Sequence, residues 1–131
     1  MEAGKLRIDV KGLATGEIDV MVWVKNTGTV AHTFYVHLWA CEGITGSYCS
    51  LNHTGNWHEG GSQTLPLAVG EEVGIGWPNI PIAGLLAPGT RYVMVKVYED
   101  IGENICETGA YQTFVVTAPT VSASITSITV S

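Results

Sequence analysis

Apolar and polar residues alternate with a period of two along most of this chain. In the stretch IDVMVWV, residues 18–24, every second residue is Ile or Val. Successive side chains of a β-strand point to opposite faces of the sheet, so this period predicts a strand with one buried face. No stretch has the spacing of three and four residues that an amphipathic helix requires. The pattern therefore predicts an all-β protein with almost no helix.

The same period marks about seven short strands separated by turn residues. The expected strands lie near residues 6–10, 18–25, 32–41, 62–67, 73–77, 92–98 and 111–116. On the third of them, Phe34, Val36, Leu38 and Ala40 share the face that we expect to be buried. Residues 42–61 are polar and rich in Gly, which predicts a long irregular excursion with one short strand near residues 48–51. Strands of this number and spacing predict an antiparallel immunoglobulin-like β-sandwich.

A chain of 131 residues is long enough for one domain with a real core, and we expect residues 1–118 to form it. Residues 119–131 contain no charged residue and have strong β propensity. Because an exposed strand of this kind aggregates unless it is paired, we expect an additional C-terminal strand that docks on a neighbouring copy or another protein. The alternatives are an extra strand of its own domain and the first strand of a following repeat. The expected contact residues are Val121, Ile125, Ile128 and Val130.

The charge balance excludes several classes of partner. The formal net charge is -6 with only six Lys and Arg, whereas nucleic-acid binding needs a clustered positive surface. Attachment to an anionic membrane is disfavoured for the same reason, and no apolar run approaches the roughly 20 residues that cross a bilayer. The first nine residues carry charges where a signal peptide needs its apolar segment, so we expect synthesis in the cytoplasm or a chain already processed.

Large side chains occupy the faces opposite the expected core. The strand at residues 18–24 turns its valines inward, which leaves Met21 and Trp23 outward. By the same rule Tyr35, His37 and Trp39 share the outward face of the third strand, where we expect His37 to be exposed. Several large outward side chains on one small domain indicate a surface that a partner covers. We therefore predict that these five residues contact a partner protein.

No arrangement of residues indicates catalysis. His32 and His37 are separated by an odd number of positions on one strand, so they point to opposite faces and do not converge on a metal ion. The chain shows no Ser/His/Asp arrangement, no phosphate-binding Gly loop and no paired carboxylate set. We expect no enzyme activity and no cofactor.

The chain has three cysteines, Cys41, Cys49 and Cys106. The third strand ends at Cys41 and the next segment returns toward Cys49, so a disulfide between these two is the expected pairing. Cys106 is expected to be free or to pair with another chain. An alternative is a zinc site made by Cys41, Cys49, His53 and His58, although the spacing between its two cysteines is wider than usual.

Two further motifs lie in expected loops. Residues 99–107 carry Glu99, Asp100, Glu103 and Glu107, which could hold calcium but lack the full spacing of an EF-hand. An acidic hairpin that is simply solvated is the alternative. The triplet 52–54, Asn-His-Thr, is a formal glycosylation acceptor.

Four stretches together resemble a known family. They are AHTFYV at residues 31–36, LPLAVGEEV at 65–73, APGT at 87–90 and VMVKVYED at 93–100. In this order and spacing they resemble the CARDB-like, immunoglobulin-like modules of prokaryotic and viral surface proteins, over residues 5 to 117 approximately. The resemblance implies a non-catalytic spacer, adhesive unit or assembly domain. One departure is Arg91, which stands where the family usually has an aromatic residue.

Three functions agree with these features of the sequence. The leading hypothesis is a structural subunit or decoration module of a virion or an extracellular filament, and the absence of a visible signal peptide favours the virion. The second is a carbohydrate-binding or adhesive module that stacks sugar rings on Trp23, Tyr35 and Trp39. The third is a zinc hydrolase around His53 and His58.

Overall fold

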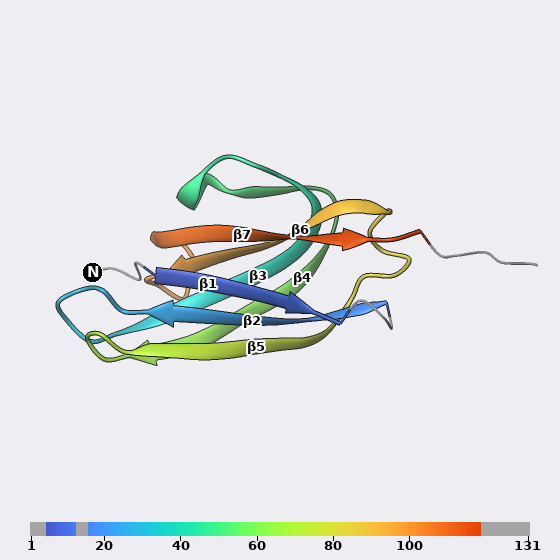
Figure 1. The fold of residues 1–131 in the computed structure, drawn as a ribbon. Helices are drawn as coiled ribbons and strands as arrows, with labels where there is room; N and C mark the ends of the chain where they lie inside the picture. Colours follow the sequence, from blue (N-terminus) through green and yellow to red (C-terminus); the bar gives the residue numbers. More distant parts are fainter. Residues whose placement is uncertain (1–4, 13–15, 119–131) are drawn as a thin grey trace, which may run out of the picture.

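The computed structural model describes residues 5–12 and 16–118, which form two packed antiparallel sheets (Figure 1). The three-stranded sheet has the order β1 (Lys5–Lys11), β2 (Glu17–Lys25), β5 (Glu72–Pro81). The four-stranded sheet has the order β4 (Asn52–Leu67), β3 (His32–Thr45), β6 (Gly89–Tyr98), β7 (Cys106–Val116). The predicted all-β sandwich with seven antiparallel strands is confirmed.

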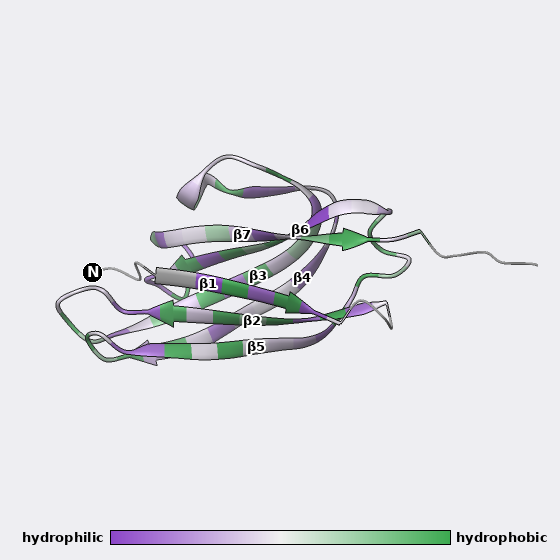
Figure 2. Ribbon diagram, in the orientation of Figure 1, coloured by the Kyte–Doolittle hydropathy of each residue, from purple (hydrophilic) through white to green (hydrophobic). Residues whose placement is uncertain are grey.

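The core lies between the two sheets and follows the alternation of the sequence. Hydrophobic and polar residues alternate along the strands in Figure 2, most clearly on β1 and β2. On β2 the valines at 20, 22 and 24 are buried, and on β3 Phe34, Val36 and Leu38 are buried beside Ala40. The predicted inward faces of both strands are therefore confirmed.

Helical structure is confined to one turn among the described residues, the 3-10 helix η2 at Tyr48–Ser50. No helix within residues 5–12 and 16–118 combines the length and apolar character needed to cross a membrane.

Residues 42–61 differ from their prediction. They form the far end of a long β3–β4 hairpin, with η2 at its tip, in place of an irregular excursion with a short strand. Two irregularities in the pairing, at Leu38/Trp39 and at Cys41/Gly43, bend this end of the hairpin. A second small core of Cys41, Leu51 and Met94 joins the hairpin to β6. The hairpin end thus covers part of the outer face of the four-stranded sheet, as Figure 1 shows above β7.

The predicted disulfide between Cys41 and Cys49 is wrong, and so is the prediction that Cys106 is unpaired within the chain. Cys49 is bonded to Cys106, with 5.7 Å between their Cα atoms, and Cys41 is a buried free thiol. The physical reason is the bent hairpin, because η2 is carried away from Cys41 and onto the start of β7. The hydroxyl of Tyr48 donates to the carbonyl of Glu107 at 2.7 Å beside this disulfide.

The two lateral sides of the sandwich differ. Between β4 and β5, the Trp77 indole N–H donates to the Gly60 carbonyl at 3.1 Å, and the Gln63 amide donates to the Gly76 carbonyl at 2.7 Å. On the other side β1 and β7 lie close together, but they are not hydrogen-bonded neighbours in either sheet. A slot of about 480 Å³ lies there.

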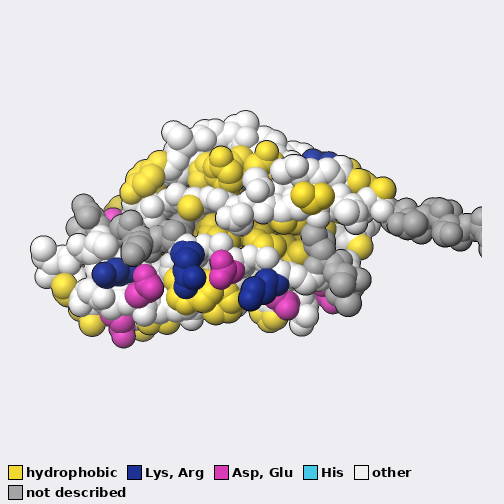
Figure 3. Space-filling view, in the orientation of Figure 1, with side chains coloured by type: hydrophobic (Ala, Val, Ile, Leu, Met, Phe, Trp, Pro, Cys, Tyr) yellow, Lys and Arg dark blue, Asp and Glu magenta, His cyan; other side chains and the backbone are white. Residues whose placement is uncertain are grey.

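The slot is lined by Ile8 and Val10 from β1 and by Phe114 from β7, with polar neighbours on both strands. Figure 3 views the molecule from this side, where hydrophobic side chains are visible between the charged side chains along β1 and the second sheet. Within residues 5–12 and 16–118, β2 is the hydrogen-bonded neighbour of β1 and β6 is that of β7, so both strands lie at a sheet edge, and such an edge is a template for another strand.

Arg91 lies in β6, directly after the β5–β6 connection. Its guanidinium donates to the carbonyls of Ala87 at 2.6 Å, Pro88 at 2.8 Å and Glu42 at 3.3 Å. The Glu42 carboxylate in turn accepts from the backbone N–H of Ala87 at 2.8 Å. A polar network therefore fixes the β5–β6 connection to β3 in this chain.

Candidate functional site

The five predicted partner-contact residues of the body lie on two opposite outer faces of the sandwich. Met21 and Trp23 belong to the three-stranded sheet, whereas Tyr35, His37 and Trp39 belong to the four-stranded sheet. The two groups cannot form one continuous surface, because the packed core separates them.

Trp23 is held in place by its own sheet. Its ring lies over Gly74 of β5, where an added Cβ would stand 2.7 Å from the indole nitrogen. The guanidinium of Arg7, a residue of β1, lies 3.8 Å from the centroid of the Trp23 ring, which is a cation–π distance. Trp23 is therefore partly covered by neighbouring strands, while Met21 beside it is exposed.

His37 is buried, and the prediction that it is exposed is wrong. Its Nδ1 donates to the Glu103 carboxylate at 2.5 Å, and its Nε2 lies 2.9 Å from an oxygen of Glu59. The second contact does not meet the geometry of a hydrogen bond. His37 thus ties β3 to β4 and to the β6–β7 loop, which carries Glu103.

A row of four aromatic rings begins at His37 and crosses β3 and β4. The ring of Trp39 stacks on His37 with centroids 3.8 Å apart and 5° between their planes. His53 lies 6.3 Å from Trp39, and Trp57 stacks on His53 at 4.3 Å. The row is buried at the His37 end and open at the Trp57 end, where 42% of the residue is exposed.

Burial shifts the pKa values of two side chains near His37, Lys96 and Tyr98. Lys96 lies directly opposite His37 on β6, and burial lowers its pKa while Glu103 opposes that change. Tyr98 is buried, and burial followed by the charges of Glu103 and Asp100 raises its pKa. Glu103 therefore lies among three polar side chains of the four-stranded sheet.

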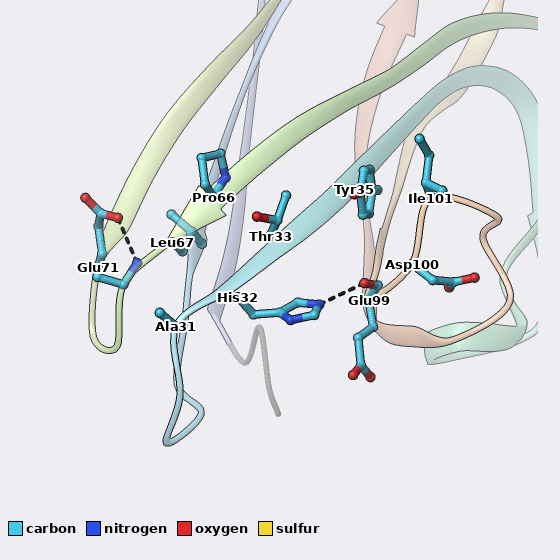
Figure 4. Close-up of a pocket in the computed structure, with 11 residues that line it drawn as sticks. Ala31, His32, Thr33, Tyr35, Pro66, Leu67, Glu71, Glu99, Asp100 and Ile101 are labelled. Atoms are coloured by element: carbon cyan, nitrogen blue, oxygen red, sulfur yellow. Dashed lines mark hydrogen bonds between the residues drawn. The ribbon is translucent and has the colours of Figure 1, made fainter.

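A shallow hollow of about 680 Å³ lies at the end of the sheet where β3 begins (Figure 4). Tyr35, Asp100 and Ile101 line one part of it, and Pro66, Leu67 and Glu71 line the other. His32 donates to the carbonyl of Glu99 at 2.8 Å and so joins the start of β3 to the β6–β7 loop. The hollow is open and has no cluster of reactive groups among its lining residues.

In the acidic β6–β7 loop, the Asp100 carboxylate accepts hydrogen bonds from the backbone of the loop itself. Asp100 accepts from the backbone N–H of Asn104 at 2.9 Å and of Ile105 at 2.8 Å. Among residues 5–12 and 16–118, no group of three or more His, Cys, Asp or Glu side chains is placed to hold a metal ion. Cys49 is also disulfide-bonded, so the proposed zinc set loses one of its two thiolates.

Replacing Asp100 by Asn is expected to destabilise the loop in a pH-dependent way. The hydrogen bonds from Ile105 and Asn104 lower the pKa of Asp100 in the folded protein. A carboxylate with a lowered folded pKa stabilises the fold above its unfolded pKa, and this contribution is lost as the pH falls through the folded value. Thermal unfolding should therefore separate the two proteins at pH 7 and bring them together below the ordinary Asp value of 3.8. A difference that is constant with pH would contradict this role.

Sequence reasoning missed Trp57 and Glu59, and it considered His53 as a zinc ligand and not as a member of the ring row. The segment that carries them was expected to be irregular. A prediction that β4 pairs with β3 along this segment would have found them, because the pairing places Glu59 opposite Trp39 and Trp57 opposite Cys41. The predicted tail contacts Val121, Ile125, Ile128 and Val130 lie outside the described residues.

Solved structures show what this fold is similar to. A Bacteroides uniformis β-glucuronidase matches with a TM-score of 0.52 and 11% identity, over 84% of this chain and 13% of that chain. Bacteroides uniformis β-glucuronidase 2, covalently bound to cyclophellitol-6-carboxylate aziridine, matches with a TM-score of 0.54 and 10% identity, over the same shares. No protein-family model and no curated protein matches the chain. The likeness supports an immunoglobulin-like β-sandwich that resembles a small portion of these enzymes, and at this identity it shows the fold alone.

Proposed function

We propose that this chain is a non-catalytic assembly module, a subunit or decoration protein of a virion or an extracellular filament. It associates with copies of itself or with another structural protein, partly by adding residues 119–131 to a neighbour as an extra strand. The observation that carries this proposal is the slot between β1 and β7, where two sheet-edge strands flank the side chains of Ile8, Val10 and Phe114.

The contrast between the two lateral sides supports the proposal. Side chains of Trp77 and Gln63 bridge β4 to β5, so an incoming strand would have to break those hydrogen bonds. Between β1 and β7 it would meet two edge strands and the side chains of Ile8 and Val10. Strand addition gains affinity from main-chain hydrogen bonds and specificity from alternate side chains that fill pockets. The first side is thus unsuited to strand addition and the second is suited to it.

Two other features agree with this function. A disulfide such as Cys49–Cys106 persists in oxidising surroundings, which fits a virion or extracellular protein. The resemblance of residues 5–117 to CARDB-like surface modules points to the same class of structural and adhesive proteins. Residues 119–131 have alternating Val, Ile and small polar residues without charge, a composition suited to pairing with an edge strand.

The test is the size of the protein in solution. We expect sedimentation velocity to show concentration-dependent assembly of the full chain. A chain with Ile125→Lys and Ile128→Lys should remain a monomer of about 13.9 kDa, because charged side chains oppose packing of the tail against Ile8, Val10 and Phe114. The control is the pair Ser124→Lys and Ser127→Lys, which adds the same charge but keeps the apolar residues. A monomeric full chain, or equal assembly of all three proteins, would refute the proposal.

A further inference from the structure

We infer that the row of rings from His37 to Trp57 is a binding platform for neutral sugar units of a polysaccharide. This site is separate from the strand-addition edge, since it lies on the outer face of β3 and β4 and the slot lies between β1 and β7. It also differs from the platform expected from the sequence, because Trp23 lies on the opposite sheet and Trp57 takes its place.

The exposed end of the row offers an aromatic ring for sugar stacking. One side of the Trp57 ring packs on His53 at 4.3 Å, and 42% of the residue remains exposed. The face of an aromatic ring is electron-rich, and the C–H groups on one face of a pyranose are apolar and slightly positive. A sugar ring can therefore stack on the exposed surface of Trp57.

The platform is fixed in advance by the buried part of the row. His37 is held between Glu103 and Glu59, and Trp39 stacks on it with nearly parallel planes. His53 completes the contact to Trp57. Because the rings are already ordered, a ligand does not have to order them on binding, and less of its interaction energy is lost.

The groups around Trp57 define the chemistry of the ligand. Glu59 is two residues along the same strand, and its side chain is 52% exposed. Its carboxylate can accept hydrogen bonds from hydroxyl groups, whereas it repels an acidic sugar or a phosphate. A neutral sugar presents an apolar face to the ring and hydroxyls to the carboxylate, so it suits both groups.

A protein partner fits this site less well. Large exposed hydrophobic residues in the described chain are scattered over several strands and loops, and on β4 they consist of Trp57 alone. Protein interfaces require a contiguous patch of several hundred Å². One exposed ring with polar neighbours, Asn56 and Glu59, instead matches a ligand that is small and polar at its edges.

Affinity electrophoresis in native gels tests the inference with named probes: laminarin, mannan, xylan, dextran and hydroxyethyl cellulose. We expect at least one of them to retard the full chain. Trp57→Ala should weaken the affinity roughly tenfold, because one stacking contact is lost. The affinity of Trp57→Phe should lie between those of the native chain and Trp57→Ala. The matched control is Tyr111→Ala, because Tyr111 is a similarly exposed aromatic residue on the same sheet.

Three results would overturn the inference: no retardation by any of the five polymers, equal loss in the Trp57 and Tyr111 variants, or full retardation of Trp57→Ala. Thermal melting of each variant shows that a lost interaction is not a lost fold. The assembly state of Trp57→Ala should match that of the native chain, so failure of sugar binding and failure of the proposed assembly function are separate observations.

Discussion

Replacing Cys49 and Cys106 together by serine is expected to lower the free energy of unfolding by about 4 kcal/mol. The bond closes a loop with a sequence separation of 57 residues, and the loss of chain entropy in the unfolded state scales with the logarithm of that length. It also holds η2 on the start of β7, where Tyr48 donates to the carbonyl of Glu107. Urea unfolding of the two proteins measures the difference. A change below about 1 kcal/mol would show that the bond does not constrain the fold.

The pairing itself can be checked by alkylation and peptide mapping. Burial raises the pKa of the Cys41 thiol to about 11, so at pH 8 only about one molecule in a thousand carries the reactive thiolate. Iodoacetamide should therefore leave the folded protein unmodified. In denaturant without a reductant it should label Cys41, and label on Cys106 or Cys49 would contradict the disulfide.

Replacing Trp77 by alanine is expected to lower the free energy of unfolding by about 3–5 kcal/mol. Trp77 is buried, and its indole N–H satisfies the carbonyl of Gly60 across the β4–β5 side. Gly60 has no room for a side chain, since an added Cβ would stand 2.7 Å from Leu38 and 3.1 Å from the Trp77 ring. Alanine therefore leaves both a cavity and an unpaired carbonyl.

Two further variants separate these contributions, with chemical denaturation as the measurement. Trp77→Phe keeps most of the volume and loses the hydrogen bond, so it should cost about 1–3 kcal/mol. Trp23→Ala on the outer face of β2 is the control and should cost less than Trp77→Ala, because Trp23 is only partly buried. Equal losses for Trp23→Ala and Trp77→Ala would contradict the view that the β4–β5 side is closed by Trp77.

The fold could be predicted because burial on one face leaves a two-residue period in the sequence. The valines of β2 and the alternate residues Phe34, Val36, Leu38 and Ala40 of β3 follow that rule, and the structure buries them as expected. The strand content and the two-sheet arrangement follow from such segments. Strands and their buried faces could therefore be predicted from the local pattern of the sequence.

The β3–β4 hairpin could not be predicted because its far end is bent by irregular pairing. Neither of the two pairing irregularities, at Leu38/Trp39 and Cys41/Gly43, has a clear sequence signal, and they decide where Cys49 lies. Glycine-rich composition suggested a loop, but Gly43 lies within the strand pair, where an added Cβ would meet the Thr54 hydroxyl and force that side chain to turn. The disulfide partner was consequently assigned to Cys41 in place of Cys106.

His37 shows a second limit of sequence reasoning. The alternation placed it correctly on the outer face of β3, but that face is partly covered by side chains from other segments. Glu59 and Glu103 approach it from distant parts of the chain, 22 and 66 positions away along the sequence. Periodicity tells which face a residue occupies; whether another segment covers that face depends on the tertiary fold.

Cross-linking between two copies tests the central claim most directly, that the tail of one copy pairs at the β1–β7 side of another. One chain carries Thr113→Cys on β7, a second carries Ser124→Cys in the tail, and the control carries Thr64→Cys on β4 at the opposite side. The buried Cys41 and the bonded Cys49 and Cys106 do not compete in the folded protein. Mild oxidation of mixtures should link the tail cysteine to position 113 and leave position 64 unlinked. Preferential linkage at position 64, or no linkage between chains, would contradict the account.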